Sequence, residues 1–354
     1  MERDGAGRAG QRAGRGSGRG GAAGGGAQRA GRRSAAGAAR PALAIDVGGT
    51  KLAAATVEPG GRLIARRQVP TPGDLDSEGL WRTLDALVQR LLDAAGVAAP
   101  DELAGVGAGC GGPMQWPAGV VSPLNIPVWR SFPLRERLQK RFGGIPVRVH
   151  NDAICVVAGE HWRGAGRGRG NVLGMVVSTG VGGGLILDSR VISGASGNAG
   201  HIGHVVVEPV GGPLCSCGAR GCLEAIARGP ALVAWAQRAG WRQGQPDATA
   251  KDLADDGAQG HPVGVAAMRR AGRALGIAIA SAAYLCDLEV VSIGGGLSQA
   301  GQILFDPLEE TLHAHAKLAF VRDLTVVPAA LGQNAGLVGA AALIFAADRY
   351  WTGD

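Results

Sequence analysis

Two stretches of the sequence share one plan, in which a short apolar run leads through a glycine-rich turn into a second apolar run. The first covers residues 43–57 and turns through DVGGTK at 46–51, and the second covers residues 171–187 and turns through STGVGGG at 178–184. Each predicts a β-hairpin whose glycines let backbone N–H groups approach an anion. Taken alone, either could equally be an ordinary tight hairpin. Two of them in one chain can hold the two ends of a polyphosphate from opposite sides, which favours a phosphate-binding fold.

The side chains of the first turn suit a nucleotide phosphate. Thr50 can donate its hydroxyl to an anion, Lys51 adds positive charge, and Asp46 stands at a strand end where it suits indirect Mg²⁺ binding. The turn is not a Walker loop, because neither its spacing nor a following helix fits that motif. The sequence therefore predicts a phosphate site of a different kind.

A second constraint is the stretch HIGHVVVEPVGGPLCSCGARGC at residues 201–222, which holds three of the six cysteines. Three thiolates and one imidazole make a closed tetrahedral Zn²⁺ site, and the predicted ligands are His204, Cys215, Cys217 and Cys222. Closely spaced cytosolic thiols rarely form structural disulfides, so zinc is favoured over a loop of free cysteines. Such a site has no open position, and its metal would be structural. His201, three residues before His204, is a rival ligand.

Other polar residues follow predicted strands. The run at 147–150 is a predicted strand, and it delivers Asn151 and Asp152 at its carboxyl end, where α/β proteins present ligand groups. Asp152 could instead cap the helix that follows. The triplet Gly294-Gly295-Gly296 follows the predicted strand 289–293 and leaves room for a flat ring or a phosphate to approach the backbone.

The remaining periodicity predicts an α/β chain. Apolar residues at helical spacing predict helices at 78–95, 134–142, 225–239, 262–285 and 335–347, and apolar runs predict strands at 103–112 and 324–328.

Charge is concentrated in the first 40 residues. This segment contains nine arginines and two acidic residues, Glu2 and Asp4, so it carries the whole formal net charge of +7. Because the rest of the chain is neutral overall, its charge does not favour a nucleic-acid partner. The segment is Gly, Ala and Arg, with too few apolar residues to offset its ordering entropy, and is predicted to be disordered. A solvated tail and a start codon assigned too far upstream both remain open. The chain lacks an apolar run of membrane-spanning length, which predicts a cytoplasmic protein without a membrane partner.

Together these features resemble the ROK family, a group named for repressors, open reading frames and sugar kinases. The shared features are both glycine hairpins, the zinc stretch that ends in CSCGARGCLE, and the glycine triplet. The resemblance runs from about residue 43 to the C-terminus and implies a two-domain actin-like, ribonuclease H-like α/β fold with a structural zinc loop. It implies one domain at 41–150, completed by a helix at 335–350, and a second at 151–334.

The resemblance also implies a role for each motif, with ATP, Mg²⁺ and a hexose bound between the domains. Asp152 would be the general base that takes the proton of the sugar 6-hydroxyl as that oxygen attacks the γ-phosphate. The phosphates would be lined by Asp46, Gly48, Gly49, Thr50, Lys51, Thr179, Gly180, Gly182 and Gly183. The adenosine would be bordered by Gly294, Gly295 and Gly296. The sugar would face Asn125, Asn151, Asp152, His201, His204 and Glu224.

One position departs from the family pattern. Sugar kinases of the family usually have Glu-x-Gly-His where this chain reads His201-Ile202-Gly203-His204, and that Glu accepts a hydrogen bond near the sugar 2-position. An imidazole can donate or accept there. The departure puts glucose in question, and it leaves N-acetylmannosamine or another 2-substituted hexose as an alternative substrate.

Several choices stay open at this point. A glucokinase-like kinase is the leading function, and a non-catalytic, sugar-sensing regulator is a further alternative. Family repressors carry a winged helix before the kinase-like part, whereas only the Gly/Arg tail precedes residue 41 here, which argues against the regulator. The donor could be ATP or polyphosphate, and the predicted assembly is a homodimer or homotetramer.

Overall fold

The computed structural model describes residues 39–242 and 244–353. The tail predicted at residues 1–40 lies outside the described residues up to position 38. Within the described ranges, no helix is both long enough and apolar enough to cross a membrane.

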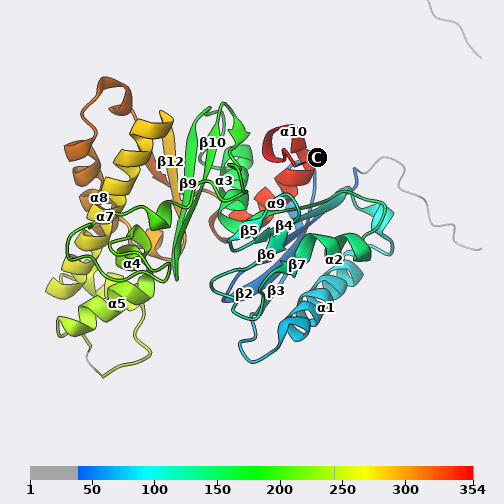
Figure 1. Cartoon of the computed structure of the whole chain (residues 1–354), viewed down its shortest axis with the longest axis horizontal. Helices are drawn as coiled ribbons and strands as arrows, with labels where there is room; N and C mark the ends of the chain where they lie inside the picture. The colour runs from blue at the N-terminus through cyan, green and yellow to red at the C-terminus, as the bar shows by residue number, and fades with distance from the viewer. Residues whose placement is uncertain (1–38, 243, 354) are drawn as a thin grey trace, which may run out of the picture. The chain divides into compact units, whose positions relative to one another are not determined.

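The N-terminal sheet has five strands in the order β3-β2-β1-β4-β8. Strand β1 pairs antiparallel with β2, and β1, β4 and β8 run parallel to one another. Helix α1 packs against β2 and β3, while α2 packs against β8 (Figure 1). The elements are β1 (Ala42–Val47), β2 (Lys51–Val57), β3 (Leu63–Pro70), α1 (Ser77–Ala95), β4 (Gly105–Cys110), α2 (Leu134–Arg141) and β8 (Val147–Asn151). A small sheet joins β5 (Met114–Gln115), β6 (Val120–Val121) and β7 (Phe132–Pro133).

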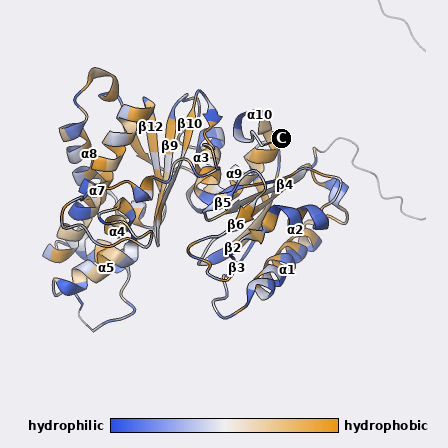
Figure 2. Cartoon of the chain, viewed as in Figure 1, coloured by the Kyte–Doolittle hydropathy of each residue, from blue (hydrophilic) through white to orange (hydrophobic). Residues whose placement is uncertain are grey.

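The C-terminal sheet repeats this plan in the order β11-β10-β9-β12-β13. Its central strand β9 pairs antiparallel with β10 and parallel with β12, as β1 does with β2 and β4. Figure 2 shows hydrophobic residues along the strands of both sheets. The strands are β9 (Val172–Val177), β10 (Val181–Leu187), β11 (Arg190–Val191), β12 (Val290–Gly294) and β13 (Thr325–Pro328). The helices are α3 (Asp152–Arg163), α4 (Leu223–Ala227), α5 (Gly229–Arg238), α6 (Ala250–Ala258), α7 (Pro262–Cys286), α8 (Gln302–His315), α9 (Ala335–Phe345) and α10 (Ala347–Tyr350).

Helices α3 and α9 pack against each other within a hydrophobic cluster that includes buried residues from both sheets. Their backbones approach so closely that a Cβ at Gly339 would overlap the Cys155 carbonyl oxygen, and one at Gly159 would overlap that of Ala335. Helix α9 also packs on β1 and β4. Only glycine permits such contact. The domain boundaries proposed from the sequence stay a prediction.

Most helices and strands lie where the sequence places them, with some differences. The helix predicted at 225–239 is two helices, because Arg228 is extended and α5 begins after it at Gly229, with Pro230 in its first turn. The second glycine turn is shorter than predicted, since Gly182, Gly183 and Gly184 belong to β10. Those glycines leave no space for side chains: a Cβ at Gly184 would lie 2.8 Å from a methyl carbon of Val157. Elements that the pattern did not predict include β3, α6, α8 and the small sheet.

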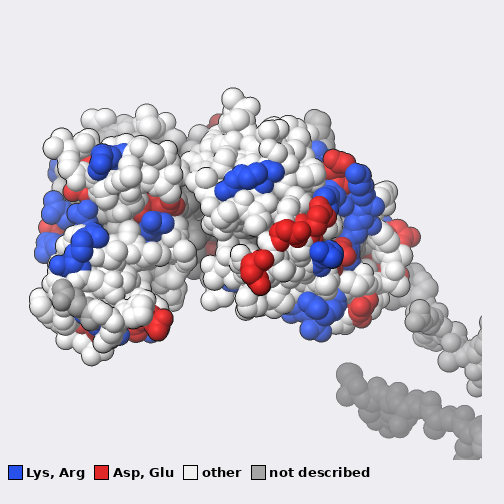
Figure 3. Space-filling model, turned by 60° about the horizontal axis from the view of Figure 1, so that its bottom comes forward, with Lys and Arg blue, Asp and Glu red and all other residues white. Residues whose placement is uncertain are grey.

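The surface of the described residues carries both signs of charge. Figure 3 shows a face on which uncharged residues predominate and where basic and acidic side chains lie next to each other mainly at the right of the view. Helix α2 contributes ion pairs from Lys140 to Glu136, at 2.5 Å, and from Arg137 to Glu78. Such exposed pairs contribute little stability.

Candidate active site and zinc loop

Asp152 is the first residue of α3 and follows β8 directly. The helix is capped by Asn151, whose Oδ1 accepts a hydrogen bond from Ala153 N at 2.9 Å. Asp152 is therefore not the cap, which the sequence left as an alternative. Its Oδ1 also accepts from Ala153 N, at 2.8 Å, and this bond lowers the carboxyl pKa. Burial has the larger effect and raises the pKa of Asp152.

Asp46 lies close enough to Asp152 for the two carboxyls to interact. Burial raises the pKa of Asp46 to about 6, with the charge of Asp152 adding to the rise, while Lys51 and Arg66 oppose it. A Cβ at Gly336 of α9 would lie 3.3 Å from Asp46 Oδ2. The missing side chain at this glycine therefore lets the Asp46 carboxylate lie close to the backbone of α9. Two neighbouring carboxyls that are each partly buried favour a cation or a proton between them.

The first hairpin turns between β1 and β2 and is held by the chain around it. Gly48 N donates to Lys51 O at 3.0 Å, and Thr71 Oγ1 donates to Gly48 O at 2.6 Å. Lys51 Nζ donates to Gln333 Oε1 at 3.2 Å, so the loop before α9 meets this turn. Thr50 is exposed at the tip. The sequence did not predict that Thr71 and Gln333 contact this turn, because no motif surrounds either residue in the sequence.

The second hairpin turns between β9 and β10, and Thr179 is exposed at its tip. Ser178 N donates to Gly180 O at 2.8 Å, and Glu224 Oε2 accepts from Val181 N at 3.0 Å. Glu224 is the second residue of α4, and this bond ties that helix to the hairpin. The carbonyl oxygen of Ser178 also accepts from Gly229 N at 2.8 Å.

The glycine triplet at residues 294–296 packs against the second hairpin. A Cβ at Gly295 would overlap the carbonyl oxygen of Val177, and one at Gly296 would lie 3.8 Å from Ser178 Oγ. Gly294 is the last residue of β12, which pairs with β9 next to the turn. The predicted adenosine and phosphate residues of this half are thus neighbours.

Four of the six predicted sugar residues, Asn125, Asn151, Asp152 and His201, gather around Gly111 and Gly112, which follow β4, whereas His204 and Glu224 are not among the neighbours of these glycines. A Cβ at Gly111 would lie 3.1 Å from Asn125 Oδ1 and 3.8 Å from Asp152 Oδ2. A Cβ at Gly112 would lie 3.0 Å from Asn151 Nδ2 and 3.4 Å from the ring of His201. Asn125 also touches the first hairpin, because a Cβ at Gly49 would lie 2.8 Å from its carbonyl oxygen.

The His201 ring completes this group from the C-terminal half. It stacks on His204, with ring centroids 6.1 Å apart and 20° between the planes. Its Nε2 is buried and has no hydrogen-bond partner among the described residues. Burial lowers the pKa of His201, His204 lowers it further and Glu224 raises it.

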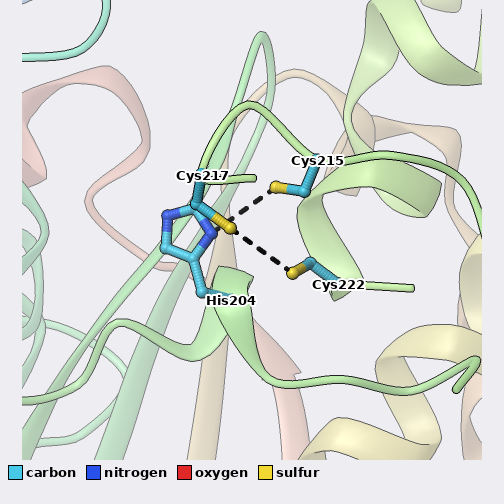
Figure 4. Close-up of side chains that lie close together, drawn as sticks. All are labelled: His204, Cys215, Cys217 and Cys222. Atoms are coloured by element: carbon cyan, nitrogen blue, oxygen red, sulfur yellow. Dashed lines mark hydrogen bonds between the residues drawn. The ribbon is translucent and has the colours of Figure 1, made fainter. Parts of the chain in front are cut away.

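Four potential metal ligands converge on one point of the loop, as Figure 4 shows. The ligand atoms of His204, Cys215, Cys217 and Cys222 all lie within 4.8 Å of one another. Cys217 Sγ and Cys222 Sγ are 3.7 Å apart, as are Cys215 Sγ and His204 Nδ1. A tetrahedral Zn²⁺ with Zn–S bonds of about 2.3 Å sets its sulfurs about 3.8 Å apart. The donor set and its spacing therefore fit zinc, and the approach of Nδ1 favours His204 over His201.

Backbone hydrogen bonds within the loop also hold it in shape, among them Val207 N to Gly221 O at 2.9 Å, Cys215 N to Ala219 O at 2.8 Å and Gly221 N to Pro213 O at 2.9 Å. Its backbone makes two isolated bridges, Val206 with Cys222 and Leu214 with Arg220. Gly221 has a φ of +74°, and a Cβ there would overlap the Glu208 carbonyl oxygen, so the wrap around the ligands requires glycine.

Residues 42–347 match the ROK family model. The chain belongs to the ROK family. It is 35% identical over 315 residues to a glucokinase of Thermotoga maritima, which covers 85% of this chain and 96% of that protein. It is also 35% identical over 302 residues to an N-acetylmannosamine kinase of Yersinia pseudotuberculosis, covering 84% and 96%.

A solved structure supports the same placement. The ROK family glucokinase of Streptomyces griseus, crystallised with glucose and AMPPNP, superposes with a TM-score of 0.74 at 34% identity, covering 86% of this chain and 98% of that chain. The two-domain actin-like α/β fold class predicted from the sequence is thereby confirmed.

Proposed function

We propose that this ROK chain transfers the γ-phosphoryl group of ATP to the 6-hydroxyl of a hexose, with glucose as the leading substrate. The observation that carries the proposal is the meeting of Asp152 with Asn125, Asn151 and His201 around Gly111 and Gly112. The similarity to glucokinases over most of their length supports the same conclusion.

Asp152 is the general base in this proposal. It accepts the proton of the sugar 6-hydroxyl as O6 forms a bond to the γ-phosphorus, and the bond from that phosphorus to the β–γ bridging oxygen breaks to release ADP. The raised pKa of Asp152 makes the carboxylate a stronger proton acceptor than an exposed aspartate. General-base catalysis of this kind contributes about 10²–10⁴-fold in rate.

The two hairpins would hold the nucleotide. Asp46 would support Mg²⁺ indirectly, which fits its position beside a second carboxyl. When bound, ATP supplies the phosphoryl group and Mg²⁺ offsets phosphate charge. The residues proposed to line the phosphates are Gly48, Gly49, Thr50, Lys51, Thr179, Gly180, Gly182 and Gly183, and those bordering adenosine are Gly294, Gly295 and Gly296.

The sugar hydroxyls would face Asn125, Asn151, Asp152, His201, His204 and Glu224. Asn151 also caps α3, so one side chain would fix both the helix start and the sugar. His204 Nδ1 faces the cysteines, which would leave Nε2 for the sugar side.

A second candidate substrate is N-acetylmannosamine. His201 favours it, because its buried Nε2 lacks a partner and can donate or accept toward a 2-substituent. The similarity to an N-acetylmannosamine kinase is as high, at 35%, as that to the glucokinase.

We further propose that Zn²⁺ is structural and that His204, Cys215, Cys217 and Cys222 hold it. The homodimer or homotetramer, the cytoplasmic location and the absence of a nucleic-acid partner stay predictions.

The test is a steady-state assay of sugar-dependent ADP formation. We expect ATP with glucose to give the highest kcat/KM, and N-acetylmannosamine or mannose to give measurable turnover if His201 broadens the site. Polyphosphate in place of ATP tests the donor. Turnover with none of these sugars would contradict the proposal.

A further inference from the structure

A cavity of about 200 Å³ lies beside the zinc loop, against helices α4 and α5. Zinc-loop residues 213–216 form one wall, α4 and α5 form another, and α7 contributes Arg270. Its lining includes Trp235 and three arginines, Arg228, Arg238 and Arg270, whereas Glu224 is its single acidic residue. Nothing in the proposed phosphoryl transfer uses these arginines.

Three arginines line the cavity, whereas two carboxylates, those of Glu208 and Glu224, lie beside them, so the described residues leave an excess of one positive charge. Arg228 Nε is buried without a hydrogen-bond partner, and the Arg238 side chain forms no ion pair or hydrogen bond with any described residue. Arg270 donates to Glu208 Oε2 at 2.8 Å. Glu224 keeps its negative charge, but its oxygens accept from neutral donors, Oε2 from Val181 N at 3.0 Å and Oε1 from Ser216 Oγ at 3.4 Å, and it forms no ion pair with the three arginines among the described residues. A buried guanidinium N–H without an acceptor is costly, and an anion in the cavity would remove that cost.

The shape and chemistry indicate which anion fits. Guanidinium forks match phosphate oxygens in a bidentate manner, and three of them suit a dianion better than a carboxylate. The volume is below the roughly 300–1,000 Å³ of pockets for drug-sized ligands, which favours a small anion over a nucleotide. Trp235 offers a ring against which a small organic group can pack. We propose that this cavity binds a small phosphate ligand, either inorganic phosphate or a phosphate monoester, through Arg228, Arg238 and Arg270.

The position of the cavity predicts that phosphate binding is coupled to sugar binding. Cys215 and Glu224 line it, and they also belong to the zinc site and the sugar site proposed above. A ligand that restrains both residues would change sugar affinity, and sugar would change phosphate affinity by the same factor. This linkage rests on the proposed function, whereas the binding itself does not.

The direct test is calorimetric titration of the full chain with inorganic phosphate at constant ionic strength. A non-hydrolysable ATP analogue present throughout would occupy the glycine hairpins and exclude binding there. We expect Arg238→Ala to weaken phosphate binding about tenfold, since one charge-assisted contact is lost. Arg238 is exposed, so the fold should survive, and an unchanged Tm verifies this.

Arg269→Ala is the matched control. It removes the same charge next to Arg270, but Arg269 pairs with exposed Glu310 at 3.1 Å and does not line the cavity. Its phosphate affinity should stay within about twofold of the wild type, because long-range charge effects are screened. Equal losses in both variants, or no wild-type binding at millimolar phosphate, would overturn the proposal.

A titration with phenyl phosphate in the same background distinguishes the two sources of phosphate, because this monoester lacks the sugar hydroxyls that the proposed active site would bind. Tighter binding than inorganic phosphate, reduced by Trp235→Ala, assigns a monoester. Equal affinity, insensitive to that substitution, assigns inorganic phosphate. Binding of the monoester that Arg238→Ala does not weaken would contradict the site.

Discussion

The end of β8 and the zinc loop both contribute to the candidate active site, but they are held in place by different means. At β8, the neighbours of Asp152 are core residues, with Val149 and Ile154 fully buried. In the zinc loop, Val206, Val210 and Leu214 are 48%, 88% and 65% exposed, and two isolated bridges supply the β pairing. Packing therefore positions the base, whereas backbone hydrogen bonds and, in our proposal, coordination together position the loop. A substitution at the end of β8 should therefore leave the zinc loop largely intact, and the reverse should also hold.

The largest expected effect comes from Asp152→Asn. Asparagine keeps the shape but cannot accept the proton, so kcat should fall by about 10²–10⁴-fold or more. Zinc content, Tm and sugar binding should be unchanged, which separates chemistry from loop integrity. Because burial raises the pKa of Asp152, wild-type activity should decline on acidification at a higher pH than an exposed aspartate gives. Near wild-type turnover in the variant would refute the assignment.

Cys217→Ser should disrupt the second of the two compared regions, the zinc loop. We expect one zinc per chain in the wild type and none in the variant, with Tm lower by at least about 5 °C, since metal binding is coupled to folding of this loop. Cys286→Ser is the control, because that half-buried cysteine is remote from the four ligands in the sequence and is not one of them. Elemental analysis of reduced protein decides the matter, and an absence of zinc in fresh wild-type protein would rule the site out.

Glu160→Gln tests how rigidly the packed region holds the loop before α9. The fully buried Glu160 carboxylate accepts from Ala165 N at 2.8 Å, Ala330 N at 3.0 Å and Leu331 N at 2.8 Å. An amide loses an acceptor among these donors, so unfolding free energy should drop by about 1–3 kcal/mol with zinc retained. Glu309→Gln, at an exposed position on α8, should change nothing. Chemical denaturation measures both, and equal stabilities would show that the three bonds are not needed.

A smaller effect is expected at His201, where the two regions meet. His201→Glu restores a carboxylate near the proposed sugar 2-position and should lower the KM for glucose about threefold to tenfold relative to N-acetylmannosamine. His313→Glu, exposed on α8, is the control for charge. If the sugar preference is unchanged and zinc is retained, His201 does not set specificity.

Deletion of residues 1–38 should have the smallest effect. That segment lacks an apolar pattern with which to dock on either region, so Tm, zinc content and kcat should match the full chain. A Tm lowered by several degrees would show that the segment contributes to the fold.

The sequence predicted the fold through features that act locally. Alternating apolar runs and glycine turns fixed both hairpins, and the spacing of Cys215, Cys217 and Cys222 anticipated the converging ligands. Contacts between distant segments were not predictable in the same way. Gln333 meets Lys51 across 282 positions, and Glu160 meets Leu331 across 171, with no local pattern to mark either pair. Helix α8 was missed because Pro307 interrupts its apolar spacing.

The most direct measurement of the central claim is the identification of the product formed from ATP and glucose. Phosphorus and carbon NMR of the reaction should show ADP and a phosphate ester on glucose O6 in equal amounts, with neither formed by Asp152→Asn. ADP with inorganic phosphate, or a phosphate on another hydroxyl, would contradict the assignment of Asp152 as the base for the 6-hydroxyl.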